Sequence, residues 1–225
     1  ANCLWYDYFM AGTFFGGRTM IRRNVLQGML GLFGFSATTF APKILSADVA
    51  ETIFVLMGDE YHTKNDVVFF VKRLNGDKEW FVNGERHRED GPAIEHANGE
   101  KHWWINGKRH RVDGPAIELE SGHKEWFVNG ERHRIDGPAK EWYDSTKEWY
   151  LNGQLHRTDG PACEYADGAK HWYVNGKLHR TDGPAVEWTN GTKQWFVNGK
   201  RHREDGPAIE WAGGSKYWYE YGKFC

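Results

Sequence analysis

An internal repeat of 23 residues occupies residues 76–225 and governs how this chain can fold. Each unit follows the pattern K-x-W-[FWY]-[VIL]-N-G-x-x-H-R-x-D-G-P-A-x-E-x-x-x-G. Six units are complete, and a seventh from Gly214 has Tyr221 in place of Asn and Cys225 in place of His. The first aromatic residue of the unit keeps strict register at Trp80, Trp103, Trp126, Trp149, Trp172, Trp195 and Trp218. Such a repeat predicts identical supersecondary units that bury a core by stacking on one another.

The residues of one unit favour a β-hairpin. Lys78–Val82 is short, aromatic and β-branched, which is typical of a strand. Asn83-Gly84 follows, and both residues tolerate the positive φ angles of a two-residue hairpin turn. Pro92 ends the return segment because it cannot donate a hydrogen bond to a ladder. Ala93–Ala97 is a second predicted strand before the turn at Asn98-Gly99.

Glycine and proline spacing disfavours helices in the repeats. The chain has 27 glycines, and no stretch of the repeats without Gly or Pro is long enough for three helical turns. We therefore predict an all-β fold, an elongated array of antiparallel β-hairpin repeats, with a short N-terminal helical or apolar segment and a capping hairpin. Trp80 and Phe81 face opposite ways on a strand, and the periodicity leaves open which aromatic column is buried. Cys163 is predicted to be a small core residue, in a column that Lys140 interrupts.

The repeat resembles the MORN repeat, which is of similar length and has a Trp, an Asn-Gly turn and a Gly-x-x-His segment such as Gly84-x-x-His87. It resembles more closely the W-x-x-N-G-x-x-H-R-x-D-G-P-A repeats of uncharacterised proteins from phages, large DNA viruses and bacteria. The resemblance covers residues 76–225. It implies an elongated hairpin array that serves as a scaffold, sometimes near membranes, and it implies no catalytic residues.

Residues 1–75 do not repeat, and their first part suggests export. Met20 is interpreted as a native start after an upstream segment, residues 1–19. Residues 20–47 resemble a twin-arginine signal, with Arg22-Arg23, a weakly apolar run and a small residue, Ala47, before the cleavage point. The alternative is an amphipathic helix that caps the array. Export predicts a periplasmic or secreted protein; without it, the protein is cytoplasmic or virion-associated. The apolar run is shorter than the roughly 20 residues of a membrane span.

Residues 48–75 are predicted to cap the array. Thr52–Gly58 and Asp66–Arg73 have the composition of strands, and the polar stretch Asp59–Asn65 is interpreted as the connection between them. A hairpin here would cover the edge of the first repeat, which is otherwise open to association.

Overall composition excludes some classes of protein. The formal net charge of −2 argues against a generic nucleic-acid binder, which is usually basic. Cys3, Cys163 and Cys225 are too few and too widely spaced for a disulfide framework or a CxxC metal site. Every polar candidate for catalysis recurs in equivalent surroundings, whereas an active site is a single uneven constellation. We therefore expect a protein that is not an enzyme and has no cofactor.

The His-Arg-x-Asp segment of each unit is the first candidate site. Adjacent units of two strands each lie about 10 Å apart at about 4.8 Å per strand, while zinc ligands lie about 2.0–2.1 Å from the metal. Histidines of successive units cannot share an ion, so we predict no metal here. We expect Arg88 and Asp90 to pair across a turn and His87 to bond turn carbonyls. The alternative is a ladder of arginines that contacts an anion or partner: Arg88, Arg111, Arg134, Arg157, Arg180 and Arg203.

A further aromatic column is the second candidate site. It consists of Trp142, Tyr165, Trp188 and Trp211, which could stack on sugars with avidity from the repeats or could pack between hairpins. The expected function is a scaffold that binds a protein or surface partner along an extended β face. Alternatives are a carbohydrate-binding module that recognises a surface glycan, and a virion or cell-surface structural protein that self-associates.

Overall fold

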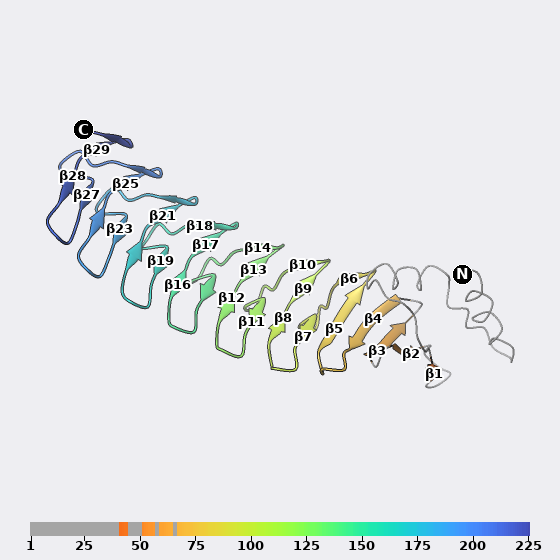
Figure 1. Ribbon diagram of the computed structural model, residues 1–225. Coiled ribbons are helices and arrows are strands. Elements are labelled where there is room, and N and C mark those ends of the chain that lie inside the picture. Colours follow the sequence, from red (N-terminus) through yellow and green to blue (C-terminus); the bar gives the residue numbers. More distant parts are fainter. Residues whose placement is uncertain (1–40, 45–50, 57–58, 65–66) are drawn as a thin grey trace, which may run out of the picture. The chain divides into compact units, whose positions relative to one another are not determined.

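The computed structural model describes residues 41–44, 51–56, 59–64 and 67–225 (Figure 1). Every regular element in these ranges is a β-strand, which confirms the all-β array of antiparallel hairpin repeats. Residues 20–47, for which the sequence suggests a twin-arginine signal or a capping helix, lie outside the described residues, except for strand β1 (Ala41–Ile44). Among the described residues, no helix is long and apolar enough to cross a membrane.

Four strands precede the repeats and form an antiparallel meander. After β1 come β2 (Glu51–Leu56), β3 (Asp59–Lys64) and β4 (Val67–Lys72), each paired with the next. β4 pairs in turn with β5 (Lys78–Val82), where Phe70 lies opposite Trp80. The edge of the first repeat is therefore covered, as predicted, because β4 continues the sheet beyond β5.

The prediction that Asp59–Asn65 only connects two strands is wrong, because β3 lies within it. Antiparallel sheets can leave one face in water, so a strand may be polar at alternate positions. Tyr61 supplies the buried position of β3 and is only 2% exposed.

From β5 onward each repeat adds two antiparallel strands to one long sheet (Figure 1). The five-residue strand predicted at Ala93–Ala97 is shorter in the structure, because regular pairing is limited to Ile94–Glu95. The strands of the long sheet after β5 are, in spatial order, β7 (Ile94–Glu95), β8 (Lys101–His102), β11 (Ile117–Glu118), β12 (Lys124–Glu125), β15 (Lys140–Glu141), β16 (Lys147–Glu148), β19 (Cys163–Glu164), β20 (Lys170–His171), β23 (Val186–Glu187), β24 (Lys193–Gln194), β27 (Ile209–Glu210) and β28 (Lys216–Tyr217).

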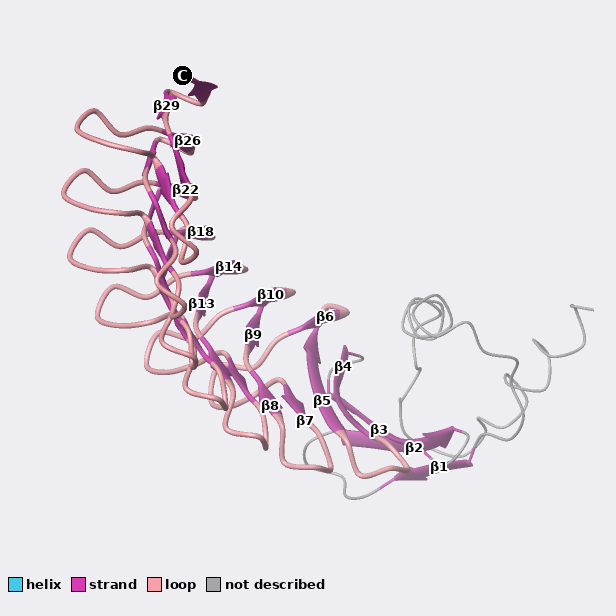
Figure 2. Cartoon of the chain, turned by 60° about the vertical axis from the view of Figure 1, so that its left-hand side comes forward, coloured by secondary structure: helices cyan, strands magenta, loops and turns pink. Residues whose placement is uncertain are grey.

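The predicted Asn-Gly turns form a row of small hairpins along one side of the long sheet (Figure 2). Asn83 and Gly84 have φ of 51° and 81°, as a type I′ turn requires, and the later units repeat this. The hairpin strands are β6 (Glu85–Arg86), which pairs with β5, and the pairs β9 (Trp104–Ile105) with β10 (Lys108–Arg109), β13 (Phe127–Val128) with β14 (Glu131–Arg132), β17 (Tyr150–Leu151) with β18 (Gln154–Leu155), β21 (Tyr173–Val174) with β22 (Lys177–Leu178), β25 (Phe196–Val197) with β26 (Lys200–Arg201), and β29 (Tyr219–Glu220) with β30 (Lys223–Phe224).

Backbone hydrogen bonds join each small hairpin to the next. Arg88 N–H donates to the carbonyl of Trp104 at 3.0 Å, and Gly107 N–H donates to the carbonyl of Arg86 at 3.0 Å. Equivalent bonds link the later units, for example from Gly130 to Arg109. The array is therefore fastened along both the long sheet and the hairpin row.

Small and apolar columns form the core. The alanine of every DGPA segment from Ala93 to Ala208 is fully buried, and Cys163 is 2% exposed, which confirms its predicted core position. Phe81 and Phe127 are also buried, at 8% and 5% exposure. Trp80 on the opposite face is half-buried, and Trp218 at the end of the same column is 49% exposed, so the column of Phe81 lies deeper in the core.

Candidate functional site

The arginine of each unit forms an internal clamp. In the first unit, the Arg88 guanidinium lies 4.0 Å from the centre of the Trp80 ring. Its Nε donates to Asp90 Oδ1 at 2.9 Å, and its Nη1 donates to the Pro92 carbonyl and to Glu95 Oε1, both at 3.2 Å. The predicted pairing of Arg88 with Asp90 is present, and the tryptophan and glutamate add to it. Arg111, Arg134, Arg157, Arg180 and Arg203 repeat these contacts.

This clamp explains why the unit carries His-Arg-x-Asp-Gly-Pro-Ala-x-Glu. A Cβ on Gly91 would lie 2.9 Å from the Arg88 guanidinium carbon, so a larger residue would displace the clamp. The hydrogen bond from Arg88 also lowers the pKa of Asp90, so this carboxylate stays ionised at more acidic pH than an ordinary aspartate does. Much of the hydrogen-bonding capacity of the arginine ladder is therefore directed inward.

The histidine ladder joins neighbouring units, a different role from the expected bond to turn carbonyls. Asn106 N–H of the second unit donates to His87 Nδ1 at 3.1 Å. The same bond links His110 to Asn129 and His133 to Asn152. His87 Nδ1 also lies 2.8 Å from Asn106 Oδ1, so this one nitrogen contacts both the backbone and the side chain of the turn in the next unit.

Lys140, which interrupts the apolar core column, has partners that satisfy its charge. Its ammonium lies 3.9 Å from the centre of the Trp142 ring and 3.8 Å from Glu125 Oε1. Glu125 is nearly buried and also accepts from Arg132 and His123, both at 2.8 Å. A charge can occupy this column because other side chains of the same unit provide a local ion network.

The column of Trp142, Tyr165, Trp188 and Trp211, called here the aromatic row, lies beside the ends of the long-sheet strands. Trp142, Trp188 and Trp211 are 37%, 43% and 47% exposed, and Tyr165 is half-buried. Threonines hold the turns that carry the row: Thr146 Oγ1 accepts from Ala166 N–H at 3.1 Å, and Thr192 Oγ1 from Ala212 N–H at 3.2 Å. Each residue of the row directly follows a strand of the long sheet, and the three tryptophans leave a large part of their side chains exposed.

Two contacts fix the ring of Trp142. Its Nε1 donates to Glu148 Oε1 at 3.2 Å, and the ring packs on His123 with centres 4.5 Å apart. Between Trp142 and Tyr165 lies an open depression of about 440 Å³, which Lys147, Glu164 and Lys170 also line. The row thus offers flat apolar faces flanked by charges of both signs.

His171 lies between Tyr165 and Trp188, with ring centres 4.9 and 5.0 Å away. Burial lowers the pKa of His171 below 6.5. In the unfolded chain this group takes up its proton first as pH falls, so its contribution to stability is lost with acidification below about pH 6.5. We expect the free energy of unfolding of the wild type to fall more between about pH 7 and pH 5 than that of His171→Gln. Denaturant titration at several pH values measures this, and equal slopes for the two proteins would contradict it.

No protein-family model matches this sequence, and no curated protein matches it significantly. The repeat geometry and the side-chain contacts therefore carry the functional argument.

Proposed function

We propose that this protein is a repeat scaffold without catalytic activity that binds a protein partner along the aromatic row. The observation that carries the proposal is a partly exposed aromatic ring at the same position of four successive units, on a sheet of fixed spacing. Two strands per unit put successive rings about 10 Å apart. A partner that touches several units gains avidity that a single ring cannot supply. The MORN-like character of the repeat supports a scaffold role.

The chemistry of the row suits a protein interface. Tryptophan and tyrosine are enriched at such interfaces, where they combine a large apolar area with a polar atom. Lys147, Glu164 and Lys170 beside the row supply charges of both signs for a polar rim. The inward-directed arginine clamps keep the sheet rigid, which lowers the entropic cost of binding.

The double substitution Trp142→Ala and Trp188→Ala is expected to abolish partner capture. Removal of two anchors should lower affinity about 100-fold or more, because each buried aromatic anchor contributes about 2 kcal/mol or more. The protein is immobilised, and the proteins that it retains are quantified by mass spectrometry. The affinity of the recovered partner for the wild type and for each variant is then measured. The matched control is Val112→Ser with Ile135→Ser, since both residues are 87% exposed and lie off the row. An identical set of retained proteins for both double variants would refute the proposal.

A surface glycan is the second candidate ligand. The ring spacing of about 10 Å is close to the length of one disaccharide in an extended polysaccharide, and open tryptophan faces stack on sugar rings. Gel electrophoresis in the presence of soluble polysaccharides tests this with the same two double variants. If a polysaccharide slows the migration of the wild type but not that of the Trp142→Ala and Trp188→Ala double variant, the aromatic row binds a glycan.

Self-association is a further candidate, and exposed aromatic side chains of the repeat from Gly214 favour it. Tyr217, Trp218, Tyr221 and Phe224 are 40% to 67% exposed. Apolar side chains that lie together on a surface favour association. A molecular mass that rises with protein concentration in analytical ultracentrifugation would support a structural role at a surface or in a virion.

We propose export for the N-terminal segment on the basis of its Arg22-Arg23 pair and apolar run. Cleavage after Ala47 would remove β1 and leave β2 as the edge strand of the meander. The intact mass of the protein from fractionated cells distinguishes a chain that starts at Asp48 from one that retains Met20.

A further inference from the structure

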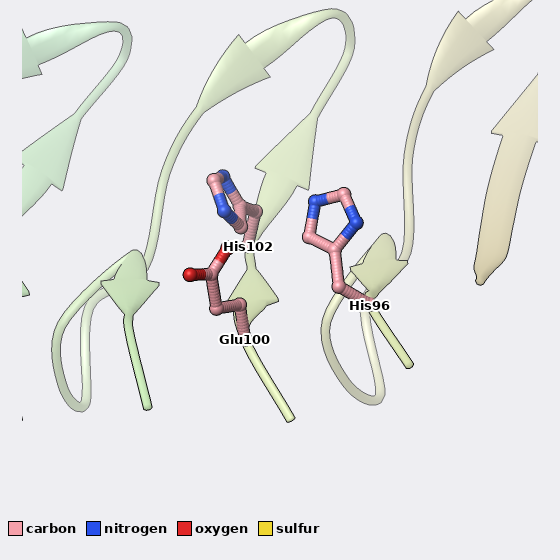
Figure 3. A group of neighbouring side chains, drawn as sticks. All are labelled: His96, Glu100 and His102. Atoms are coloured by element: carbon pink, nitrogen blue, oxygen red, sulfur yellow. The ribbon is translucent and has the colours of Figure 1, made fainter. Parts of the chain in front are cut away.

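Three side chains with metal-ligand chemistry converge at the turn between β7 and β8 (Figure 3). His96 follows β7, Glu100 precedes β8, and His102 ends β8. One nitrogen or carboxylate oxygen from each residue lies within 4.8 Å of the others. None of these residues belongs to the His-Arg ladder.

His96 is oriented by a neighbouring carboxylate. Its Nδ1 lies 3.1 Å from Asp77 Oδ2, while Asp77 Oδ1 accepts from Ala97 N–H at 2.8 Å. Figure 3 shows one ring nitrogen of His96 turned toward His102 and the other turned away. The hydrogen bond from Ala97 lowers the pKa of Asp77, which keeps it anionic. A carboxylate behind an imidazole is the usual outer partner of a metal-binding histidine.

His102 has a buried nitrogen that the fold leaves unsatisfied. Its Nε2 is shielded from solvent and has no hydrogen-bond partner among the described residues. Buried polar atoms without partners are uncommon and call for an explanation.

The repeat architecture does not require this trio. The equivalent positions 23 residues further along hold Leu119, His123 and Glu125, and there His123 Nε2 lies 2.8 Å from Glu125 Oε1 in a direct pair. The later units have an aromatic residue at the first position and Thr146, Ala169, Thr192 or Ser215 at the second. His171, which corresponds to His102, also has an unsatisfied Nε2 but has no acidic residue at the position of Glu100.

We propose that His96, Glu100 and His102 bind a divalent transition metal ion of the zinc type, with Asp77 as the residue that orients His96. Two imidazole nitrogens and one carboxylate oxygen form a three-ligand set, which leaves a position for water. Tetrahedral zinc requires ligand atoms about 3.4 Å apart, so the ligands close by about 1 Å on binding. The Glu100 side chain is half-buried in a turn and has the rotamer freedom for this movement.

Calorimetric titration of the full chain with Zn²⁺ tests the site. We expect the wild type to bind one equivalent that His96→Gln, Glu100→Gln and His102→Gln each remove. Asp77→Asn should weaken it about 10–100-fold, the usual effect of losing an outer partner. His171→Gln is the matched control, because it removes a similarly buried imidazole from the same column and should leave zinc affinity unchanged.

Absence of zinc binding by the wild type would overturn the proposal, and so would affinity retained in Glu100→Gln and His96→Gln. Circular dichroism of each variant verifies its fold. If His102→Gln unfolds, Glu100→Gln and His96→Gln decide the result, because these residues lie at a turn outside the core.

Discussion

Arg180→Ala is expected to lower the free energy of unfolding by about 2–4 kcal/mol, since it removes a cation–π contact and charge-assisted hydrogen bonds at a half-buried position. The guanidinium lies 4.1 Å from the Trp172 ring centre and donates to Asp182, to the Pro184 carbonyl and to Glu187. Its loss leaves the Pro184 carbonyl without this donor and uncovers the tryptophan. Denaturant titration gives the change, and hydrogen exchange at the Trp172 amide locates it.

Two further variants separate the clamp from simple loss of charge. Arg180→Lys keeps the charge but cannot reproduce the planar fork, so we expect it to lose most of the same stability. Arg201→Ala is the matched control, because Arg201 is exposed and its nearest ring centres are 5.5 and 5.7 Å away. Equal effects of Arg180→Ala and Arg201→Ala would show that the clamp contributes nothing special.

Phe127→Ala is expected to destabilise the protein by about 3–5 kcal/mol, the usual effect of truncating a buried aromatic residue. Phe127 is 5% exposed and forms a buried cluster with Ala116 and Ile117, against which Trp103 and Leu119 pack. The cavity would lie between two units, because Phe127 belongs to the third unit and Ile117 to the second. Thermal and denaturant unfolding measure the effect.

Ile135→Ala is the control for this truncation. Ile135 is 87% exposed and lies in the segment between His-Arg and Asp-Gly-Pro of the same unit, so its change should be within about 0.5 kcal/mol. A Phe127→Ala protein as stable as Ile135→Ala would mean that the core does not lie where the structure places it.

Local chemistry was enough to predict much of the fold. Asn83-Gly84 is a sharp hairpin signal because few residue pairs accept positive φ twice, and the structure has this turn in every unit. The burial of Cys163 followed from its place in an apolar column. The role of Asp59–Asn65 was missed because its polar composition hides a buried position at Tyr61.

Contacts between units could not be predicted from the pattern of one unit. The Arg88–Asp90 and Arg88–Glu95 contacts lie within one unit, whereas the bond from Asn106 to His87 spans nineteen residues and joins two units. Likewise, His96 and His102 meet only because β7 and β8 are paired strands. Periodicity shows which residues recur, while the sheet register decides which of them touch.

The bonds between small hairpins bear on how such a gene changes length. Each unit donates to and accepts from its neighbours through the same backbone atoms, as Gly107 does toward Arg86 and Gly130 toward Arg109. Unequal recombination that inserts or deletes a whole multiple of 23 codons therefore restores every junction, whereas an insertion of another length disrupts the register at the point of insertion. The array can therefore lengthen or shorten in steps of one 23-residue unit, and the length of the sheet changes by two strands with each step.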